Sequence, residues 1–143
     1  MNDTHNDQTP LQPASGLVSY THVIYALHSF AVLTGLLTSG SVAGRFVFGL
    51  PSIIAVIMNY ARRHEARGSY LESHFSWQIR TFWLALLGLV IILLISAPLI
   101  LLMGLGVLTA WIGFGLVGVW VIYRVARGWL ALRAARTLPM VQT

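Results

Sequence analysis

The feature that most constrains this chain is a stretch without any charged residue, residues 81–123. A helix rises about 1.5 Å per residue and a hydrocarbon core is roughly 30 Å thick, so this stretch is about twice as long as one crossing needs. It therefore predicts a hairpin of two membrane helices. Pro98, Gly104 and Gly106 lie near its middle and predict that the chain turns there.

The composition also favours a membrane location. Hydrophobic residues make up 57% of the chain and charged residues 9%, whereas about a quarter of the residues in a soluble domain are charged. The basic residues are all arginines that flank apolar runs, so we expect anionic lipid headgroups as partners and no nucleic acid. The chain has no cysteine, which excludes disulfides, thiolate metal sites and cysteine nucleophiles.

The apolar runs predict an all-α membrane protein with four transmembrane helices in two hairpins. Residues 1–16 are polar, contain two prolines and predict a disordered tail. The transmembrane domain is expected to cover 17–132, and a C-terminal tail that frays from Leu138 is expected over 133–143. The expected spans are residues 17–38, 42–61, 81–102 and 105–124, to within a few residues.

The second span allows two interpretations. The run between Arg45 and Arg62 is short, and Gly49 and Pro51 interrupt its first third. A full crossing requires the helix to begin near Val42, with the side chain of Arg45 extending towards the headgroups. We expect this crossing because of the flanking charges, and the alternative is a re-entrant segment that enters and leaves on one side.

The arginines predict the orientation. They are concentrated in the connection after the second span and in the C-terminal tail, whereas the other two connections contain only Arg45. Short arginine-rich segments stay in the cytoplasm, so both termini are expected there. The third and fourth helices are expected to extend into the cytoplasmic interface.

Polar side chains recur on one face of the first span. Thr21, Tyr25 and His28 have helical spacing, and we expect this face to point into the bundle because lipid does not solvate it. Ser69 and Glu72 form a capping-box pattern at the start of the third helix, whose first three turns are expected to be interfacial. These patterns either anchor the third helix at the cytoplasmic surface or form a polar cluster at the cytoplasmic end of the bundle. The expected members of this cluster are His22, Tyr25, His28, Asn59, Glu72, His74, Gln78 and Arg80.

Aromatic residues and arginines predict a belt where hydrocarbon gives way to phosphate. Such a belt is either a lipid anchor or a docking surface for a partner protein. Its expected members are Trp77, Trp83, Trp120, Tyr123, Arg124 and Arg127. Glu72 is expected to form an ion pair with one of these arginines.

Small residues predict close helix packing. Ala31 and Gly35 on the first span, and Gly106, Ala110 and Gly113 on the last span, recur three or four residues apart. Such series let a neighbouring helix approach closely.

Four segments of the chain resemble a known family. They are THVIYALH (21–28), FGLPSIIAVIMNYARR (48–63), YLESHFSWQIRTFW (70–83) and VWVIYRVARGWLAL (119–132). They resemble the small bacterial inner-membrane proteins that share a domain of unknown function and are grouped, distantly, with the Tic-twenty subunit of the chloroplast import machinery. The resemblance implies a multi-pass, four-helix protein of the bacterial inner membrane without an assigned reaction. No catalytic residue carries over, and Arg45 is an unusual charge for the second connection.

Three classes of function remain. We expect a non-enzymatic interaction or assembly subunit of a membrane complex, with another membrane protein or a second copy as its partner. The alternative is a small transporter, or a proton- or ion-conducting protein, that uses the polar face around His28. An enzyme, a cofactor or a metal is not expected. Only Glu65 and Glu72 are acidic outside the N-terminal tail, and no two histidines have the spacing of a helical metal site.

Overall fold

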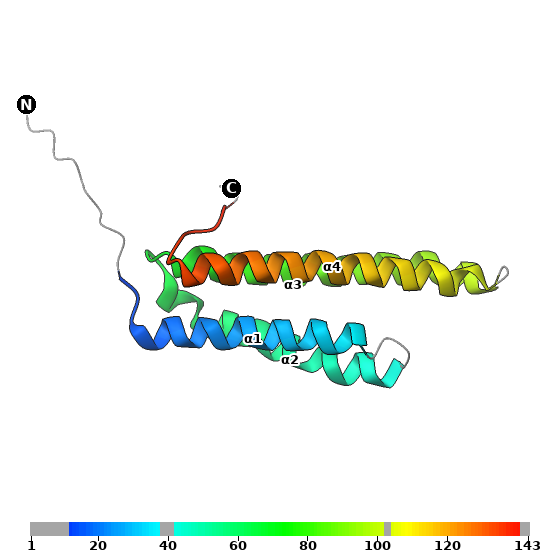
Figure 1. Cartoon of the computed structure of the whole chain (residues 1–143), viewed down its shortest axis with the longest axis horizontal. Coiled ribbons are helices and arrows are strands. Elements are labelled where there is room, and N and C mark those ends of the chain that lie inside the picture. The colour runs from blue at the N-terminus through cyan, green and yellow to red at the C-terminus, as the bar shows by residue number, and fades with distance from the viewer. Residues whose placement is uncertain (1–11, 38–41, 102–103, 141–143) are drawn as a thin grey trace, which may run out of the picture.

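In the computed structural model, which describes residues 12–37, 42–101 and 104–140, the chain forms four long helices and one short helical turn. The elements are α1 (Ser15–Leu37), α2 (Val42–Arg62), the 3-10 helix η1 (Arg63–Ala66), α3 (Leu71–Leu101) and α4 (Leu105–Arg133). α1 pairs with α2, and α3 pairs with α4. The two hairpins lie side by side, with α1 against α4 (Figure 1).

Three of the described helices, α1, α3 and α4, are long and apolar enough to cross a membrane. This confirms the prediction of a helical membrane protein, and the number of long helices agrees with the four expected spans. α1 begins at Ser15, so the last two residues of the expected N-terminal tail are helical, while residues 1–11 lie outside the described part. The side chains of residues 42–48, including Arg45, also lie outside it, and the choice between crossing and re-entry stays a prediction.

α3 ends at Leu101 and α4 begins at Leu105, which agrees with the expected spans 81–102 and 105–124. The expectation that Pro98 takes part in the turn is wrong, because α3 continues through it. A proline removes one hydrogen bond from a helix, but a long helix keeps its direction through the bonds on either side. In the described part of the turn, Gly104 has a φ of 74°, in the left-handed region that favours glycine. Pro51 likewise lies inside α2 and does not end it.

Two glycines of α4 allow α3 and α4 to pack closely. A Cβ at Gly106 would overlap the backbone carbonyl of Ser96, and a Cβ at Gly113 would lie 2.9 Å from Ile92 Cγ1. The small-residue series of α4 is therefore used inside its own hairpin. By contrast, a Cβ at Gly35 in α1 would meet no described atom within 4 Å.

The two hairpins are level at one end only. Gly128 of α4 packs against Tyr25 of α1, and Gly118 packs against Leu36 near the end of α1. The part of α4 from Leu105 to Gly118, roughly 20 Å long, therefore extends past α1. Figure 1 shows the α3–α4 hairpin reaching beyond the end of α1, on the side far from the C-terminus.

The chain after α4 folds back onto the start of α3. Ala135 has a φ of 49°, which turns the chain at the end of the helix. The backbone N–H of Leu138 then donates a hydrogen bond to Ser73 Oγ at 2.9 Å, and Leu138 is only 6% exposed. The expectation that the tail frays from Leu138 is therefore wrong at this residue, because its side chain and its amide both have partners on the bundle.

Candidate functional site

The start of α3 lies in the buried core at the arginine-rich end of the molecule. Leu71 and Phe75 are fully buried, as their shared face predicts, but His74 and Gln78 on the neighbouring face are buried as well. The first turns of α3 are therefore covered by the bundle, while their expected depth at the membrane interface stays a prediction. Both faces are covered because α1, α2 and α4 all contact α3 and the C-terminal tail covers its first turn.

A chain of hydrogen bonds joins α1, α3 and the tail through His74. His74 Nε2 lies 2.8 Å from the backbone carbonyl oxygen of Arg136, which can only accept, so Nε2 donates. Nδ1 then accepts a hydrogen bond from the Tyr25 hydroxyl at 3.0 Å. A neutral His74 with its proton on Nε2 satisfies both contacts.

Trp129 of α4 extends this group of contacts. Its ring stacks on Tyr25, with centroids 6.3 Å apart and an interplanar angle of 12°. Its Nε1–H donates to His22 Nδ1 at 2.9 Å. Tyr25 can sit here because Gly128 has no side chain, since a Cβ at that position would lie 2.8 Å from Tyr25 Cε1. Thus His22, Tyr25 and His74 come together as predicted.

Asn59 of α2 and Gln78 of α3 form a polar interior beside this cluster. Asn59 is fully buried, and neither of its amide atoms has a hydrogen-bond partner among the described residues. Gln78 lies near the Tyr25 hydroxyl, but its amide atoms make no hydrogen bond of normal geometry. A buried polar group without a partner costs about 1–3 kcal/mol. Membrane proteins keep such groups mainly where they serve function or specificity.

His28 lies deeper along α1 and is separate from the cluster. Its Nδ1 is 2.9 Å from Ser52 Oγ, and this contact links α1 to α2. Its Nε2 is buried without a hydrogen-bond partner in the described part of the chain. His28 therefore faces the bundle, as its helical spacing with Thr21 and Tyr25 predicts.

Glu72 lies outside the cluster and stabilises the start of α3. Its Oε2 accepts the backbone N–H of Gly68 at 3.0 Å, while Ser69 Oγ accepts the N–H of Leu71 at 3.3 Å. The capping-box pattern thus acts as a cap, although the carboxylate reaches Gly68 instead of Ser69. Because Glu72 is held at this helix start, it cannot also reach the arginines of α4.

The expected ion pair between Glu72 and an arginine of the belt is therefore not formed. The ion pair in the described part of the chain joins Arg62 and Glu65, with Arg62 Nε 2.7 Å from Glu65 Oε1. The Arg62 guanidinium holds the pKa of the Glu65 carboxyl below its usual value. This pair is exposed at the turn after α2.

Trp77 is buried and does not belong to an exposed belt. Its Nε1–H donates to the backbone carbonyl of Arg124 at 3.1 Å. The Arg124 guanidinium lies over the Trp77 ring, 3.7 Å from its centroid, and Arg124 Nε donates to Thr81 Oγ1 at 2.7 Å. Arg80 and Arg127 lie 5.7 Å and 5.8 Å from the same centroid. Arg80 thus belongs with Trp77 and not with the polar cluster.

The other aromatic residues of the predicted belt are exposed. Trp83 donates through Nε1 to the Tyr60 hydroxyl at 3.1 Å, and Tyr123 accepts a hydrogen bond from Arg127 at 3.3 Å. Trp120 lies beside Arg124, with 5.1 Å between its ring centroid and the guanidinium. These three rings are available to lipid or to a partner protein.

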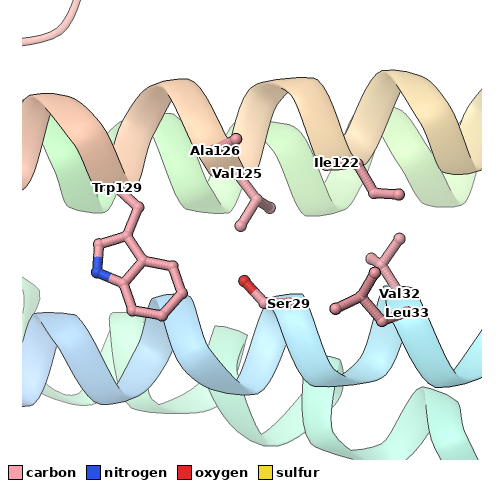
Figure 2. Close-up of a pocket in the computed structure, with 7 residues that line it drawn as sticks. All are labelled: Ser29, Val32, Leu33, Ile122, Val125, Ala126 and Trp129. Atoms are coloured by element: carbon pink, nitrogen blue, oxygen red, sulfur yellow. The ribbon is translucent and has the colours of Figure 1, made fainter.

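Two apolar depressions lie on α4. A pocket of about 130 Å³ lies between α1 and α4, and Figure 2 shows that Ser29 and Trp129 bring the polar atoms among its labelled side chains. A more open groove of about 480 Å³ runs along α3 and α4, lined by Leu84, Leu116, Val117 and Trp120. Neither contains the converging polar groups typical of a catalytic pocket. Within the described ranges, no three histidine or acidic side chains are placed to hold a metal ion.

Three residues in these contacts have no distinctive signal in the sequence. Trp129 next to an arginine-rich tail looks like one more residue of a membrane belt. Thr81 and Ser52 look like ordinary small polar residues at the edge of apolar runs. Each becomes identifiable only through its partner on another helix.

Comparison of the chain with protein-family models, with curated proteins and with solved structures finds no match. The resemblance to the small bacterial inner-membrane family therefore stays a prediction.

Proposed function

We propose that this chain is a non-enzymatic subunit that assembles with another integral membrane protein and docks through the outer face of α2. The observation that carries this proposal is an apolar stripe on α2 at the arginine-rich end of the bundle. Leu50, Ile53, Ile54 and Ile57 form this α2 stripe and are 44%, 44%, 51% and 60% exposed.

α3 and α4 indicate where the hydrocarbon lies. Residues 81–101 and 105–123 are uncharged and each about 30 Å long, which matches the thickness of a bilayer core. Their outer surface is apolar, with Leu94 70% exposed. Arg80 and Arg124 flank these segments, and we infer that the cytoplasmic boundary of the hydrocarbon lies at their level.

The far end of the α2 stripe lies on the cytoplasmic side of this boundary. Tyr25 of α1 packs one helical turn beyond Arg124, and Tyr20 donates a hydrogen bond to the α2 backbone next to Ile57. The helix rise then places Ile57 roughly 10 Å beyond Arg124. By the same rise Ile53 and Ile54 lie within roughly 6 Å of the boundary, so Ile57 is the member of the stripe that lies clearly outside the hydrocarbon. Exposed apolar surface there supports a protein interaction site.

The same placement supports a topology with both termini in the cytoplasm of a bacterial cell. All arginines except Arg45 lie in the turn between α2 and α3, in the C-terminal tail or in the adjoining parts of α2, α3 and α4, and these segments lie at one end of the molecule (Figure 1). Arginine-rich short segments are retained on the cytoplasmic side. This orientation holds whether the α1–α2 hairpin crosses the membrane or re-enters.

The test is purification of tagged protein from its native membrane in lipid nanodiscs, followed by mass spectrometry. We expect one membrane protein to copurify in fixed proportion with the wild type and to be lost with Ile53→Ser/Ile57→Ser. Leu130→Ser is the matched control, because it makes an exposed leucine polar at the same end of α4. Recovery of the chain alone, or equal copurification with the double variant, would contradict docking through α2.

The polar interior supports a second candidate function, proton or ion conduction. His28 Nε2 and the amide of Asn59 are buried polar atoms without partners among the described residues, on the α1–α2 side of the bundle. A conducting protein needs buried polar groups that can bind and release a proton or an ion along its path. Flux measured in liposomes should then fall with His28→Leu, and equal flux from wild type and variant would remove this candidate.

A further inference from the structure

We propose that the face of α3 and α4 around Trp77 binds one anionic phospholipid. Its phosphate would lie among Arg80, Arg124 and Arg127, and one acyl chain would lie in the neighbouring groove on the hydrocarbon side. We call the three arginines with Trp77 the arginine site. This lipid site requires only that α3 and α4 cross the membrane, and it exists whether or not α2 binds a partner.

The arginine site carries three positive charges. The guanidinium groups of Arg80, Arg124 and Arg127 all approach the same indole ring. Of the residues that the structure describes, Glu65 and Glu72 are the acids, and neither forms an ion pair with these arginines. Three like charges this close repel one another. An anion between them attracts all three and makes their electrostatic energy favourable.

The Arg124 side chain is held in a fixed position on the bundle. Its Nε is fixed by Thr81 Oγ1 and its guanidinium plane lies on Trp77, so this side chain is already held in place. Arg124 is half-buried, so part of this side chain remains accessible from outside. A guanidinium presents its N–H groups in a planar fork that matches a phosphate, so Arg124 offers a pre-positioned donor for one.

An apolar groove lies beside these arginines. Leu84 lies one turn after Arg80, and Trp120 lies one turn before Arg124, so the groove begins next to the arginine site on the hydrocarbon side. Its lining is apolar apart from the indole N–H of Trp120. A groove of this kind suits an acyl chain, whereas a free phosphate would use the arginines alone.

The same features select for anionic headgroups. A zwitterionic lipid such as phosphatidylcholine brings a quaternary ammonium next to its phosphate, and three arginines without a nearby acid disfavour that second charge. Phosphatidylglycerol brings the phosphate charge alone. Basic pockets between membrane helices on the cytoplasmic side bind anionic lipids in this way.

The test counts lipids that stay bound to the purified protein in native mass spectrometry, after reconstitution in mixed phosphatidylcholine and phosphatidylglycerol. We expect one phosphatidylglycerol per wild-type chain. Arg80→Gln/Arg127→Gln should weaken its binding on the order of 30-fold, because each arginine near an anionic surface contributes about a factor of five. Arg63→Gln/Arg67→Gln is the control, since it removes the same charge from exposed positions.

A second variant tests the groove without changing charge. Leu84→Trp should fill the groove and lower phosphatidylglycerol retention, whereas Leu94→Trp, on the lipid-facing side of α3, should not. Equal retention of phosphatidylcholine, or equal binding by the two arginine double variants, would overturn the proposal. Displacement of the lipid by inorganic phosphate, with normal binding by Leu84→Trp, would show a free-anion site and would overturn it too.

Discussion

Gly128 is the described glycine of α4 at which a side chain would meet α1 most closely. A methyl group there would press on the Tyr25 ring, which cannot move because it is bonded to His74 and stacked on Trp129. We expect Gly128→Ala to lower the free energy of unfolding in detergent micelles by about 1–3 kcal/mol, as other overpacked sites do.

Gly115→Ala is the matched control in the same helix. A Cβ at Gly115 would meet no described atom within 4 Å, and alanine favours a helix over glycine by up to about 1 kcal/mol. Its free energy of unfolding should equal or exceed that of the wild type. If Gly128→Ala were as stable as Gly115→Ala, the contact between α1 and α4 would be absent in the protein.

Tyr25 supplies the hydrogen bond that satisfies His74 Nδ1 inside the bundle. Tyr25→Phe keeps the stacking on Trp129 but leaves this nitrogen buried without its donor, which should cost about 1–2 kcal/mol of unfolding free energy. The exposed Tyr123→Phe should change it by less than about 0.5 kcal/mol. Identical denaturation midpoints for the two variants would mean that the hydrogen bond contributes nothing.

At the scale of single residues, helical spacing predicts some contacts and not others. The inward face of Thr21, Tyr25 and His28 follows from spacing alone, because a polar stripe on an apolar helix has one favourable direction. Trp77 and Arg124 do not follow, because an aromatic residue and an arginine near the boundary suit lipid as well as each other.

At the scale of elements, the α3–α4 hairpin is largely predictable from its length and lack of charge. The helix ends at Leu101 and Leu105 also agree with the expected spans, and what the sequence does not predict is that Pro98 lies inside the helix. Pro98 is the stronger helix breaker in a sequence, yet one missing hydrogen bond does not end a helix of this length, whereas Gly104 supplies the positive φ that a turn needs.

The docking of the C-terminal tail onto α3 is not predictable from the sequence. Leu138 begins a short apolar run with Pro139 and Met140 that does not indicate which side chain is buried, and its docking involves Ser73 far away in the chain. Leu138→Asp should release the tail, because it would bury a charge without a partner. We expect amide hydrogen exchange over residues 134–140 to rise roughly tenfold or more.

Met140→Asp is the control for this tail variant, because Met140 is exposed. It should leave hydrogen exchange in the tail unchanged. Fast exchange at the Leu138 amide in the wild type itself would contradict the docked tail.

At the scale of the whole molecule, the offset between the hairpins determines how deep α1 reaches. Leu36 is level with Gly118, which lies six residues from Arg124, or roughly 9 Å inside the hydrocarbon boundary proposed at the level of Arg124. We propose from this register that the α1–α2 hairpin as a whole enters and leaves on the cytoplasmic side, which differs both from the expected full crossing and from re-entry of the second span alone.

Cysteine accessibility tests this depth in a chain that contains no other cysteine. Leu37→Cys replaces a side chain that is 85% exposed, and we expect it to be protected from a membrane-impermeant maleimide on both sides. Leu94→Cys should be protected in the same way, and Arg67→Cys should react from the cytoplasm. Reaction of Leu37→Cys from the outer side would show a full crossing.

The most direct test of docking through α2 is site-specific photo-crosslinking in intact cells. A photoreactive residue at Ile57 should form one discrete adduct with another membrane protein, whereas the same residue at Leu94 should react with lipid only. If Ile57 reacts only with lipid, as Leu94 does, the α2 stripe faces the bilayer and the chain does not assemble through it.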